Sequence, residues 1–197
     1  MHKKSILITG CSSGIGYSCA QTLHKRGWKV FATCRKQKDC NRLKAEGIES
    51  FLLDYQKEKT IKSALQSCLE VTGGTLDAIF NNGAFAIPGA LEDISTGALK
   101  AIFQSNVFGY HELIRLSLPI MRAQGYGRIV NCSSVLGFVA LPFRGAYNST
   151  KFAIEGLSDT LRVELIHSNI KVILIEPGPI TSQIRKNSIP KFEKWVK

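Results

Sequence analysis

Short apolar runs rich in β-branched residues alternate with longer amphipathic stretches along the chain. The apolar runs predict strands at Ser5–Thr9, Lys29–Thr33, Ser50–Leu53, Leu76–Phe80, Arg128–Cys132 and Lys171–Ile175. The amphipathic stretches predict helices at Gly14–Arg26, Gln37–Glu46, Lys57–Glu70, Ser95–Arg122 and Gly145–His167, the fourth of them divided or bent at Gly109. Strands that are apolar on both faces are typical of buried parallel strands. The alternation therefore predicts an α/β fold, a doubly wound parallel sheet with helices on both faces.

Length and composition favour one globular domain over residues 1–197. No internal repeat, low-complexity run or linker indicates a second domain. No apolar stretch reaches the roughly 18 residues of a membrane span. The short run Ile6–Ile8 near the N-terminus is too brief for a signal peptide. We therefore expect a cytoplasmic protein with no membrane span.

The cysteines and the charge argue against two further classes of protein. The six cysteines form no Cys-x-x-Cys pair and no pattern with histidine, so we expect neither a metal site nor a disulfide framework. The net charge of +11 permits binding of a nucleic acid or of a polyanionic small molecule. Because the basic residues are spread along the chain, with no Lys/Arg block among aromatic residues, no nucleic-acid partner is expected.

Ligands of doubly wound sheets bind beyond the carboxyl ends of the strands, so the residues that follow each strand are the candidates. The first strand is followed by a loop, Thr9–Gly16, that carries glycines at positions 10, 14 and 16 and opens a helix. Glycine lets the backbone turn tightly and approach a pyrophosphate, and the N–H groups of a helix start attract its charge. The spacing differs from the usual Gly-x-Gly-x-x-Gly, and a tight turn without a ligand would also use glycines. The place of the loop between strand and helix favours phosphate binding.

The ends of the second and third strands bear on the adenosine half of such a ligand. Sites for the unphosphorylated dinucleotide usually carry an acidic residue after the second strand, for the ribose 2′-hydroxyl. This chain has Arg35 and Lys36 there, and a guanidinium grips a 2′-phosphate bidentately, which favours NADP(H). The alternative is two solvated charges with no role in cofactor choice. Asp54, after the third strand, is a candidate for an adenine amine or an ordinary helix N-cap.

Later strand ends place small and polar residues at the same edge of the sheet. The fourth strand ends in Asn81-Asn82-Gly83-Ala84, where glycine allows a close approach of a cofactor, although an ordinary turn would use the same residues. The fifth strand is followed by the hydroxyl of Ser134, and the sixth by a rigid Pro177-Gly178 turn suited to lining a nicotinamide.

Tyr147 and Lys151 are four residues apart in a predicted helix and therefore lie on one face of it. An ammonium beside a phenol favours the phenolate and lowers the pKa of the tyrosine from its usual value of about 10. Such a tyrosine would exchange protons near neutral pH. Any amphipathic helix could carry the same pair without a function, so the neighbouring motifs decide.

Taken together, these motifs resemble the short-chain dehydrogenase/reductase family from Ile6 to about Ile184. The resemblance is carried by Thr9-Gly10-x-x-x-Gly14-x-Gly16, Asn81-Asn82, Asn106, Ser134, Tyr147-x-x-x-Lys151 and Pro177-Gly178. The stretches 127–134, 145–147 and 152–156 are similar to the branch that contains hydroxysteroid and retinol dehydrogenases. The resemblance implies a Rossmann fold, a nicotinamide dinucleotide as cofactor, a small-molecule carbonyl or alcohol as substrate and a homo-oligomer as a possible assembly. With Arg35 after the second strand, we expect NADP(H) to be preferred, with NAD as a possible alternative.

The family resemblance also implies roles for single residues. Tyr147 would be the general acid in reduction and the base in oxidation, and Lys151 would hold the nicotinamide ribose and lower the pKa of Tyr147. Ser134 would stabilise the substrate oxygen, and Asn106 would orient a water that relays protons toward Lys151. The cofactor-binding residues would be Thr9, Gly10, Ser12, Ser13, Gly14, Ile15, Gly16, Arg35, Asp54, Asn81, Gly83, Tyr147, Lys151, Pro177 and Gly178.

Two departures from the family pattern qualify this expectation. The family usually shows Asn-Asn-Ala-Gly where this chain has Gly83-Ala84, a tolerable exchange unless the glycine needs a positive φ. Family members also continue for several tens of residues past the Pro-Gly turn, with a substrate-binding helix pair and a final strand. We therefore expect a sheet without its last strand and an abbreviated substrate lid.

The leading hypothesis is an NADP(H)-dependent carbonyl reductase or alcohol dehydrogenase. The first alternative is a cofactor-binding protein without turnover, because the C-terminal substrate region is missing. The second is nucleic-acid binding driven by the net charge of +11.

Overall fold

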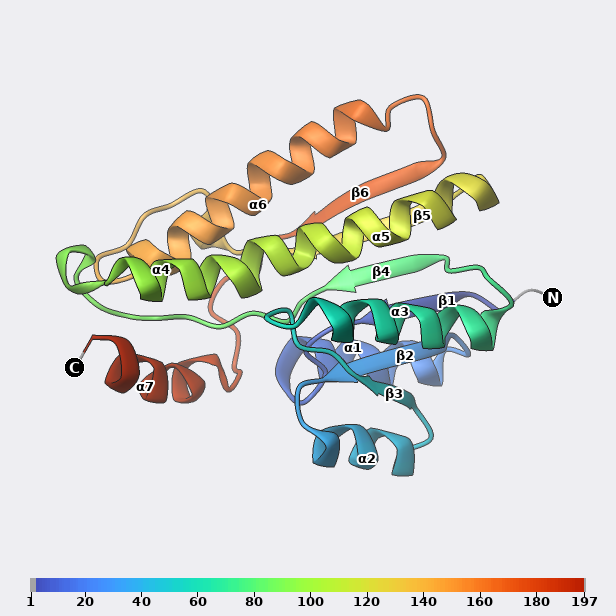
Figure 1. The fold of residues 1–197 in the computed structure, drawn as a ribbon, viewed down its shortest axis with the longest axis horizontal. Helices are drawn as coiled ribbons and strands as arrows, with labels where there is room; N and C mark the ends of the chain where they lie inside the picture. The colour runs from blue at the N-terminus through green and yellow to red at the C-terminus, as the bar shows by residue number, and fades with distance from the viewer. Residues whose placement is uncertain (1–2, 197) are drawn as a thin grey trace.

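The computed structural model describes residues 3–196, which contain a parallel sheet of six strands (Figure 1). The strands are β1 (Ser5–Ile8), β2 (Lys29–Cys34), β3 (Glu49–Leu52), β4 (Ala78–Asn81), β5 (Gly127–Cys132) and β6 (Ile170–Ile175). Their order is β3-β2-β1-β4-β5-β6, and each neighbouring pair is parallel. The chain reverses its direction of travel across the sheet between β1 and β4, and open α/β sheets bind their ligands beside such a point, outside the carboxyl ends of the strands, a place called the crevice below. The predicted doubly wound α/β fold is confirmed.

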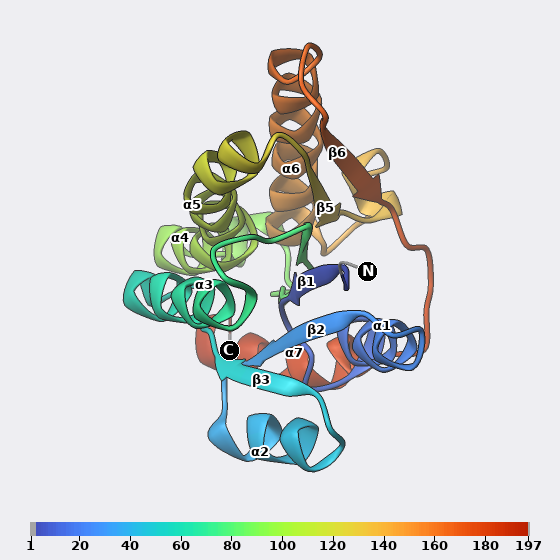
Figure 2. The ribbon, with the colours of Figure 1, turned by 90° about the vertical axis from the view of Figure 1, so that its right-hand side faces the viewer.

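Helices cover both faces of the sheet (Figure 2). They are α1 (Gly14–Lys25), α2 (Gln37–Ala45), α3 (Glu58–Thr72), α4 (Thr96–Phe103), the π-helical turn η2 (Gln104–Phe108), α5 (Gly109–Gln124), α6 (Gly145–Glu164), α7 (Ile184–Trp195) and the short 3-10 turns η1 (Leu91–Asp93) and η3 (Val135–Gly137). Helices α3, α5 and α6 pack on one face, and α1 and α2 on the other. Among the described residues no helix has the length and apolarity needed to span a bilayer.

β1 illustrates why the strands carry apolar residues on both faces. Leu7 belongs to the cluster under α3, α5 and α6, whereas Ile6 and Ile8 belong to the cluster under α1 and α2. Successive side chains of a strand point to opposite faces, so a strand covered on both sides carries apolar residues on both of its faces.

The long helical stretch before β5, which the sequence predicts to be divided or bent at Gly109, stays helical there but changes from a π-helical turn to an α-helix at this residue. Helix α4 passes through η2 into α5, and Gly109 has a helical φ of −63° and ψ of −39°. A Cβ at Gly109 would lie 2.3 Å from the Cβ of Tyr55. The glycine is there because Tyr55 packs against the helix backbone.

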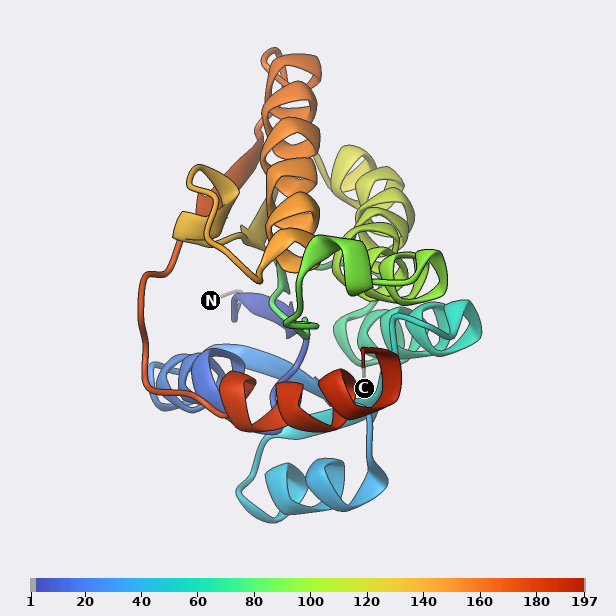
Figure 3. The ribbon, with the colours of Figure 1, turned by 90° about the vertical axis from the view of Figure 1, so that its left-hand side faces the viewer.

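The C-terminal segment forms α7, a helix that the hydrophobic pattern did not predict. It crosses the carboxyl edge of the sheet (Figures 1 and 3). At its end, Trp195 and Val196 pack against a small buried cluster made of Phe85, Ile87, Ala98, Ile102 and Ala146. Within α7 itself, Ser188 is the sole buried residue and Pro190 lies in the helix interior.

Candidate active site

The loop between β1 and α1 is built on glycines that leave no room for a side chain. Gly10 and Gly14 have φ values of +70° and +63°, in the left-handed region that favours glycine. A Cβ at Gly10 would lie 2.7 Å from the Cα of Gly83, and a Cβ at Gly16 would lie 2.7 Å from the carbonyl oxygen of Gly10. Gly83 itself has no positive φ, so its exchange with the following alanine is structurally tolerable. The structure thus brings the predicted loops after β1 and β4 into contact.

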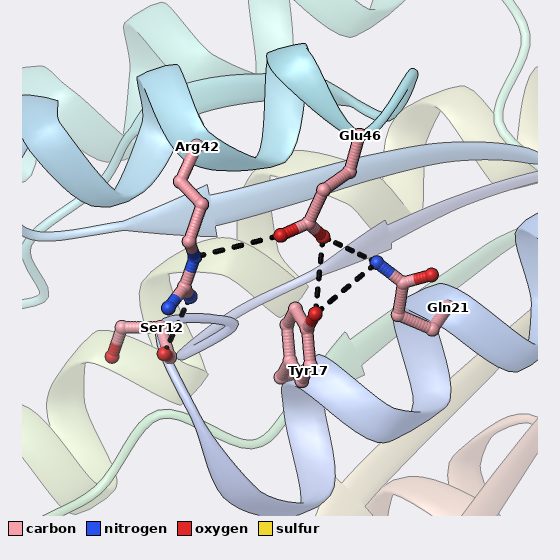
Figure 4. A network of polar contacts seen from close by, with 5 residues as sticks. All are labelled: Ser12, Tyr17, Gln21, Arg42 and Glu46. Carbon is pink, nitrogen blue, oxygen red and sulfur yellow. Dashed lines mark hydrogen bonds and ion pairs between the residues drawn. The ribbon is translucent and has the colours of Figure 1, made fainter.

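Ser12, Ser13 and Ile15 complete this loop. Ser13 is the N-cap of α1, but its side chain makes no capping hydrogen bond and the first turn carries no acidic residue. The amides of the helix start therefore have no competing anion from their own turn. Ile15 packs toward the core below, and the carbonyl oxygen of Ser12 accepts a hydrogen bond of 2.7 Å from Nη2 of Arg42 (Figure 4).

A chain of buried polar side chains runs beneath the crevice. The Oγ1 of Thr9 lies 2.8 Å from the hydroxyl of Tyr55, which donates to Oδ1 of Asn81 at 2.6 Å. Nδ2 of Asn81 donates to Oδ1 of Asn131 at 3.0 Å, and Nδ2 of Asn131 donates to Oγ of Ser158 at 2.9 Å. Burial raises the pKa of Tyr55, which keeps its phenol neutral. The chain ties β1, β4 and β5 to α6, so Thr9 and Asn81 support the crevice from below.

Arg35 and Asp54 lie at the ends of β2 and β3, where the sequence places them. Oδ1 of Asp54 accepts from the N–H of Gln56 at 3.1 Å, and Lys57 is the N-cap of α3, so the helix-cap reading of Asp54 is wrong. Helix α7 reaches this corner of the molecule. Burial lowers the pKa of the Lys191 ammonium, Arg35 acts in the same direction, and Asp54 opposes them.

The loops after β5 and β6 are joined through Ser134. Its Oγ accepts from the N–H of Leu136 at 3.2 Å and donates to the carbonyl oxygen of Pro177 at 3.4 Å. The N–H of Val135 donates to the same carbonyl at 3.2 Å. A Cβ at Gly178 would approach nothing closer than Cγ1 of Val135, at 3.9 Å, so Gly178 is not required by backbone strain or by this packing.

Lys151 and Tyr147 meet on α6, as their spacing predicts. The Lys151 side chain is buried, its Nζ donates to the carbonyl oxygen of Cys132 at 2.6 Å, and it lies 5.4 Å from the centre of the Tyr147 ring. Burial lowers the pKa of the Lys151 ammonium, and the charges of Cys132 and Glu155 act in the opposite direction. The ammonium therefore faces both the end of β5 and the ring of Tyr147.

The expected lowering of the Tyr147 pKa is wrong for this structure. Burial raises the pKa of the phenol, the nearby Cys132 thiol acts in the same direction, and the nearby Ser134 hydroxyl opposes them. The i, i+4 spacing places Lys151 against the ring of Tyr147, and its ammonium is bound to a backbone carbonyl. Tyr147 is thus in its acid form at neutral pH and lies within reach of Ser134.

Asn106 lies in the π-helical turn η2 and is fully buried. Its Nδ2 donates to the carbonyl oxygen of Phe85 at 2.9 Å and to Oγ1 of Thr150 at 3.2 Å, and its Oδ1 accepts from the N–H of Phe85 at 3.1 Å. The amide hydrogens are therefore used within the protein, and Asn106 fixes the loop after β4 against the helix of Lys151. A water that relays protons at this place could therefore donate a hydrogen bond to Asn106 but could not accept one from its side-chain amide.

Three features together define a dinucleotide-binding α/β oxidoreductase. They are the reversal point of the parallel sheet, the glycine loop beside it, and the hydroxyl and amine groups across the crevice. Among the described residues no group of three or more His, Cys, Asp or Glu could hold a metal ion. Residues 4–192 match the short chain dehydrogenase family, and this chain belongs to that family.

Comparisons with single proteins agree with this assignment. The uncharacterized oxidoreductase YbbO of Escherichia coli K12 is 44% identical over 185 residues, which cover 94% of this chain and 69% of that protein. Retinol dehydrogenase 8 of Homo sapiens is 34% identical over 186 residues, covering 91% and 60% of the two chains. The crystal structure of a short-chain dehydrogenase from Streptomyces avermitilis superimposes with a TM-score of 0.87 at 33% identity, covering 91% of this chain and 67% of that one. The predicted likeness to the branch with retinol dehydrogenases is confirmed.

Sequence reasoning missed three residues that shape the crevice, namely Tyr55, Asn131 and Arg42. Asn131 lies inside β5 and Tyr55 in the polar loop after β3, and in neither place does a buried hydrogen-bond partner leave a periodic signal in the sequence. Arg42 lies on the exposed side of α2, where its charge resembles any solvated helix residue.

Proposed function

We propose that this chain is an NADP(H)-dependent oxidoreductase that moves a hydride between the nicotinamide and a carbonyl or secondary alcohol. The observation that carries the proposal is the meeting of the Ser134 hydroxyl, the Tyr147 phenol and the Lys151 ammonium at the sheet edge that also bears the glycine loop. In this proposal residues 1–197 act as one dinucleotide-binding and catalytic domain.

The crevice fits a dinucleotide in several respects. The turn at Gly10 and the amides of Gly14–Gly16 suit a pyrophosphate, and Asp54 keeps one carboxylate oxygen for an adenine amine. Similar solved structures hold NAD, NADH or NADP, so the choice of NADP rests on Arg35. The further residues proposed to hold the cofactor are Thr9, Ser12, Ser13, Asn81, Gly83, Tyr147, Lys151, Pro177 and Gly178. When bound, the nicotinamide supplies or accepts the hydride.

The protein residues handle the proton and the developing charge. Because Tyr147 is held in its acid form, it donates its phenolic proton to the substrate oxygen during reduction without a prior ionisation. The Ser134 hydroxyl donates a hydrogen bond to the same oxygen, where negative charge develops. In oxidation Tyr147 must first lose its proton, so oxidation should accelerate as the pH rises.

Replacing Tyr147 by Phe tests the proposal because it keeps the ring and removes the acid. We expect kcat for carbonyl reduction to fall about 10²- to 10⁴-fold, while NADPH binding, measured by fluorescence titration, changes little. Tyr126→Phe is the matched control, since Tyr126 is exposed at the amino end of β5.

The outcomes separate the proposal from its rival. Equal turnover in wild type and Tyr147→Phe would overturn the assignment of the acid. Tight NADPH binding with no turnover of any aldehyde, ketone, steroid or retinoid would favour the cofactor-binding protein without catalysis.

A further inference from the structure

Arg42 forms the centre of a polar network that joins α2 to the start of α1 (Figure 4). Its Nη2 donates to the carbonyl oxygen of Ser12 at 2.7 Å, and its Nε lies 3.7 Å from Oε1 of Glu46. The guanidinium carbon lies 5.1 Å from the centre of the Tyr17 ring. Glu46 in turn accepts from the Tyr17 hydroxyl at 3.1 Å and from the amide of Gln21. The network holds a guanidinium against the glycine loop.

The position of this guanidinium relative to the crevice is specific. Ser12 belongs to the loop after β1, and Arg42 belongs to the helix that follows β2, so the contact spans the gap between these two strand ends. Burial raises the pKa of the Cys34 thiol, the last residue of β2, to about 12, and the charge of Arg42 acts in the opposite direction. The adenosine ribose of a bound dinucleotide lies at the end of the second strand, next to the loop after the first.

Arg42 has N–H donors that make no hydrogen bond within the described residues. Of its five N–H donors, one is used by the Ser12 carbonyl, and the 3.7 Å separation from Glu46 exceeds hydrogen-bond length. Within residues 3–196 its Nη1 has no hydrogen-bond partner. The side chain is 47% exposed, so the ion pair with Glu46 is weak and can yield to a stronger anion.

Building on the proposed function, we propose that Arg42 is a specificity-determining residue that binds the 2′-phosphate of the cofactor together with Arg35. A dianionic phosphate has three acceptor oxygens and is gripped bidentately by a guanidinium. One arm of Arg42 stays on Ser12, and the free arm turns from Glu46 to the phosphate. A ribose with an unmodified 2′-hydroxyl gains little from this arm.

The experiment compares the affinities of NADPH and NADH, by fluorescence titration, for Arg42→Ala, Arg42→Lys, Glu46→Gln and the control Lys44→Ala. Lys44 is an exposed cation on the same helix. We expect Arg42→Ala to weaken NADPH roughly 10- to 100-fold and NADH by no more than about twofold. Arg42→Lys should fall between wild type and Ala, because it keeps the charge and loses the fork, and Glu46→Gln should strengthen NADPH. Calorimetry with adenosine 2′-monophosphate and adenosine 5′-monophosphate gives a readout that is independent of turnover.

Each outcome of the titrations decides the inference about Arg42. An equal loss of NADPH and NADH affinity in Arg42→Ala would overturn the inference, because it would mean that Arg42 only positions the Ser12 loop. Unchanged affinity for both would overturn it as well, and in either case the proposed oxidoreductase would stand. Failure of the wild type to bind either dinucleotide would overturn the proposed function and this inference together.

Discussion

Phe143 lies four residues before Tyr147 and has a backbone φ of +60°, unlike any other non-glycine residue of the described chain. A left-handed backbone costs a bulky residue about 1–2 kcal/mol, and the side chain is 65% exposed, so burial does not compensate for it. We expect Phe143→Asn to raise the free energy of unfolding by about 1 kcal/mol, because Asn tolerates this region. Denaturant titration measures the change. Phe138→Asn is the control, since Phe138 is exposed with a negative φ, and an equal gain there would contradict the strain argument.

Arg35 tests the choice of cofactor at the second strand end. Replacing it by Asp removes a phosphate ligand and places a carboxylate where the 2′-phosphate would lie. We expect the affinity for NADPH relative to NADH to fall about 10- to 100-fold, because a charge-assisted hydrogen bond contributes about 1.5–3 kcal/mol. Lys38→Asp, an equal change of charge on an exposed residue of α2, should leave this ratio near its wild-type value. An unchanged ratio in Arg35→Asp would remove the charge argument.

Some features of single site residues could be predicted from the sequence, and others could not. The Tyr147 and Lys151 pair was predictable because helix geometry alone sets which residues share a face. The direction of the Tyr147 pKa was not, because it depends on how deeply tertiary packing buries the phenol. Tyr55 was missed because its hydroxyl bonds to Thr9 and Asn81, which lie far from it in the sequence.

Within the helices, replacing two different glycines by Ala is expected to have opposite effects on stability. A Cβ at Gly109 would lie 2.3 Å from Tyr55, whereas a Cβ at Gly156 in α6 would meet nothing within 4 Å. Helix propensity alone favours Ala over Gly by about 1 kcal/mol at both positions. We expect Gly156→Ala to stabilise the protein by up to that amount and Gly109→Ala to destabilise it by about 1–3 kcal/mol through overpacking. Thermal and denaturant unfolding decide, and stabilisation by Gly109→Ala would show that Tyr55 can move away.

The same region explains why helix boundaries were predicted less well than helix existence. The apolar period of the stretch before β5 continues without a break, so the pattern does not reveal the π-helical turn η2. That turn carries Asn106, whose hydrogen bonds go to Phe85 and Thr150, outside its own helix. Such turns are frequent at functional sites, where tertiary contacts outweigh local preference.

At the scale of the whole molecule, α7 and the predicted cofactor loop lie at one edge. A Cβ at Gly14 would lie 3.5 Å from the Cβ of Ser182, and Nζ of Lys191 lies 4.8 Å from the centre of the Phe85 ring. The sequence could not place this segment, because its amphipathic pattern is interrupted by Pro190 and contributes one buried residue, Ser188. Such sparse burial marks an element of low local stability.

We therefore expect a dinucleotide and α7 to compete for the carboxyl edge. With saturating NADPH, hydrogen exchange should speed up over residues 184–195 and slow down over residues 10–16, with α5 as the unchanged reference. Trp195→Ala should raise NADPH affinity roughly 5- to 150-fold, the range of a coupling of about 1–3 kcal/mol, because it loosens the end of α7. Ile189→Ala, at a residue that is 57% exposed on the same helix, should leave the affinity unchanged. Slower exchange in α7 and weaker binding by Trp195→Ala would instead mean that the helix closes over the bound cofactor.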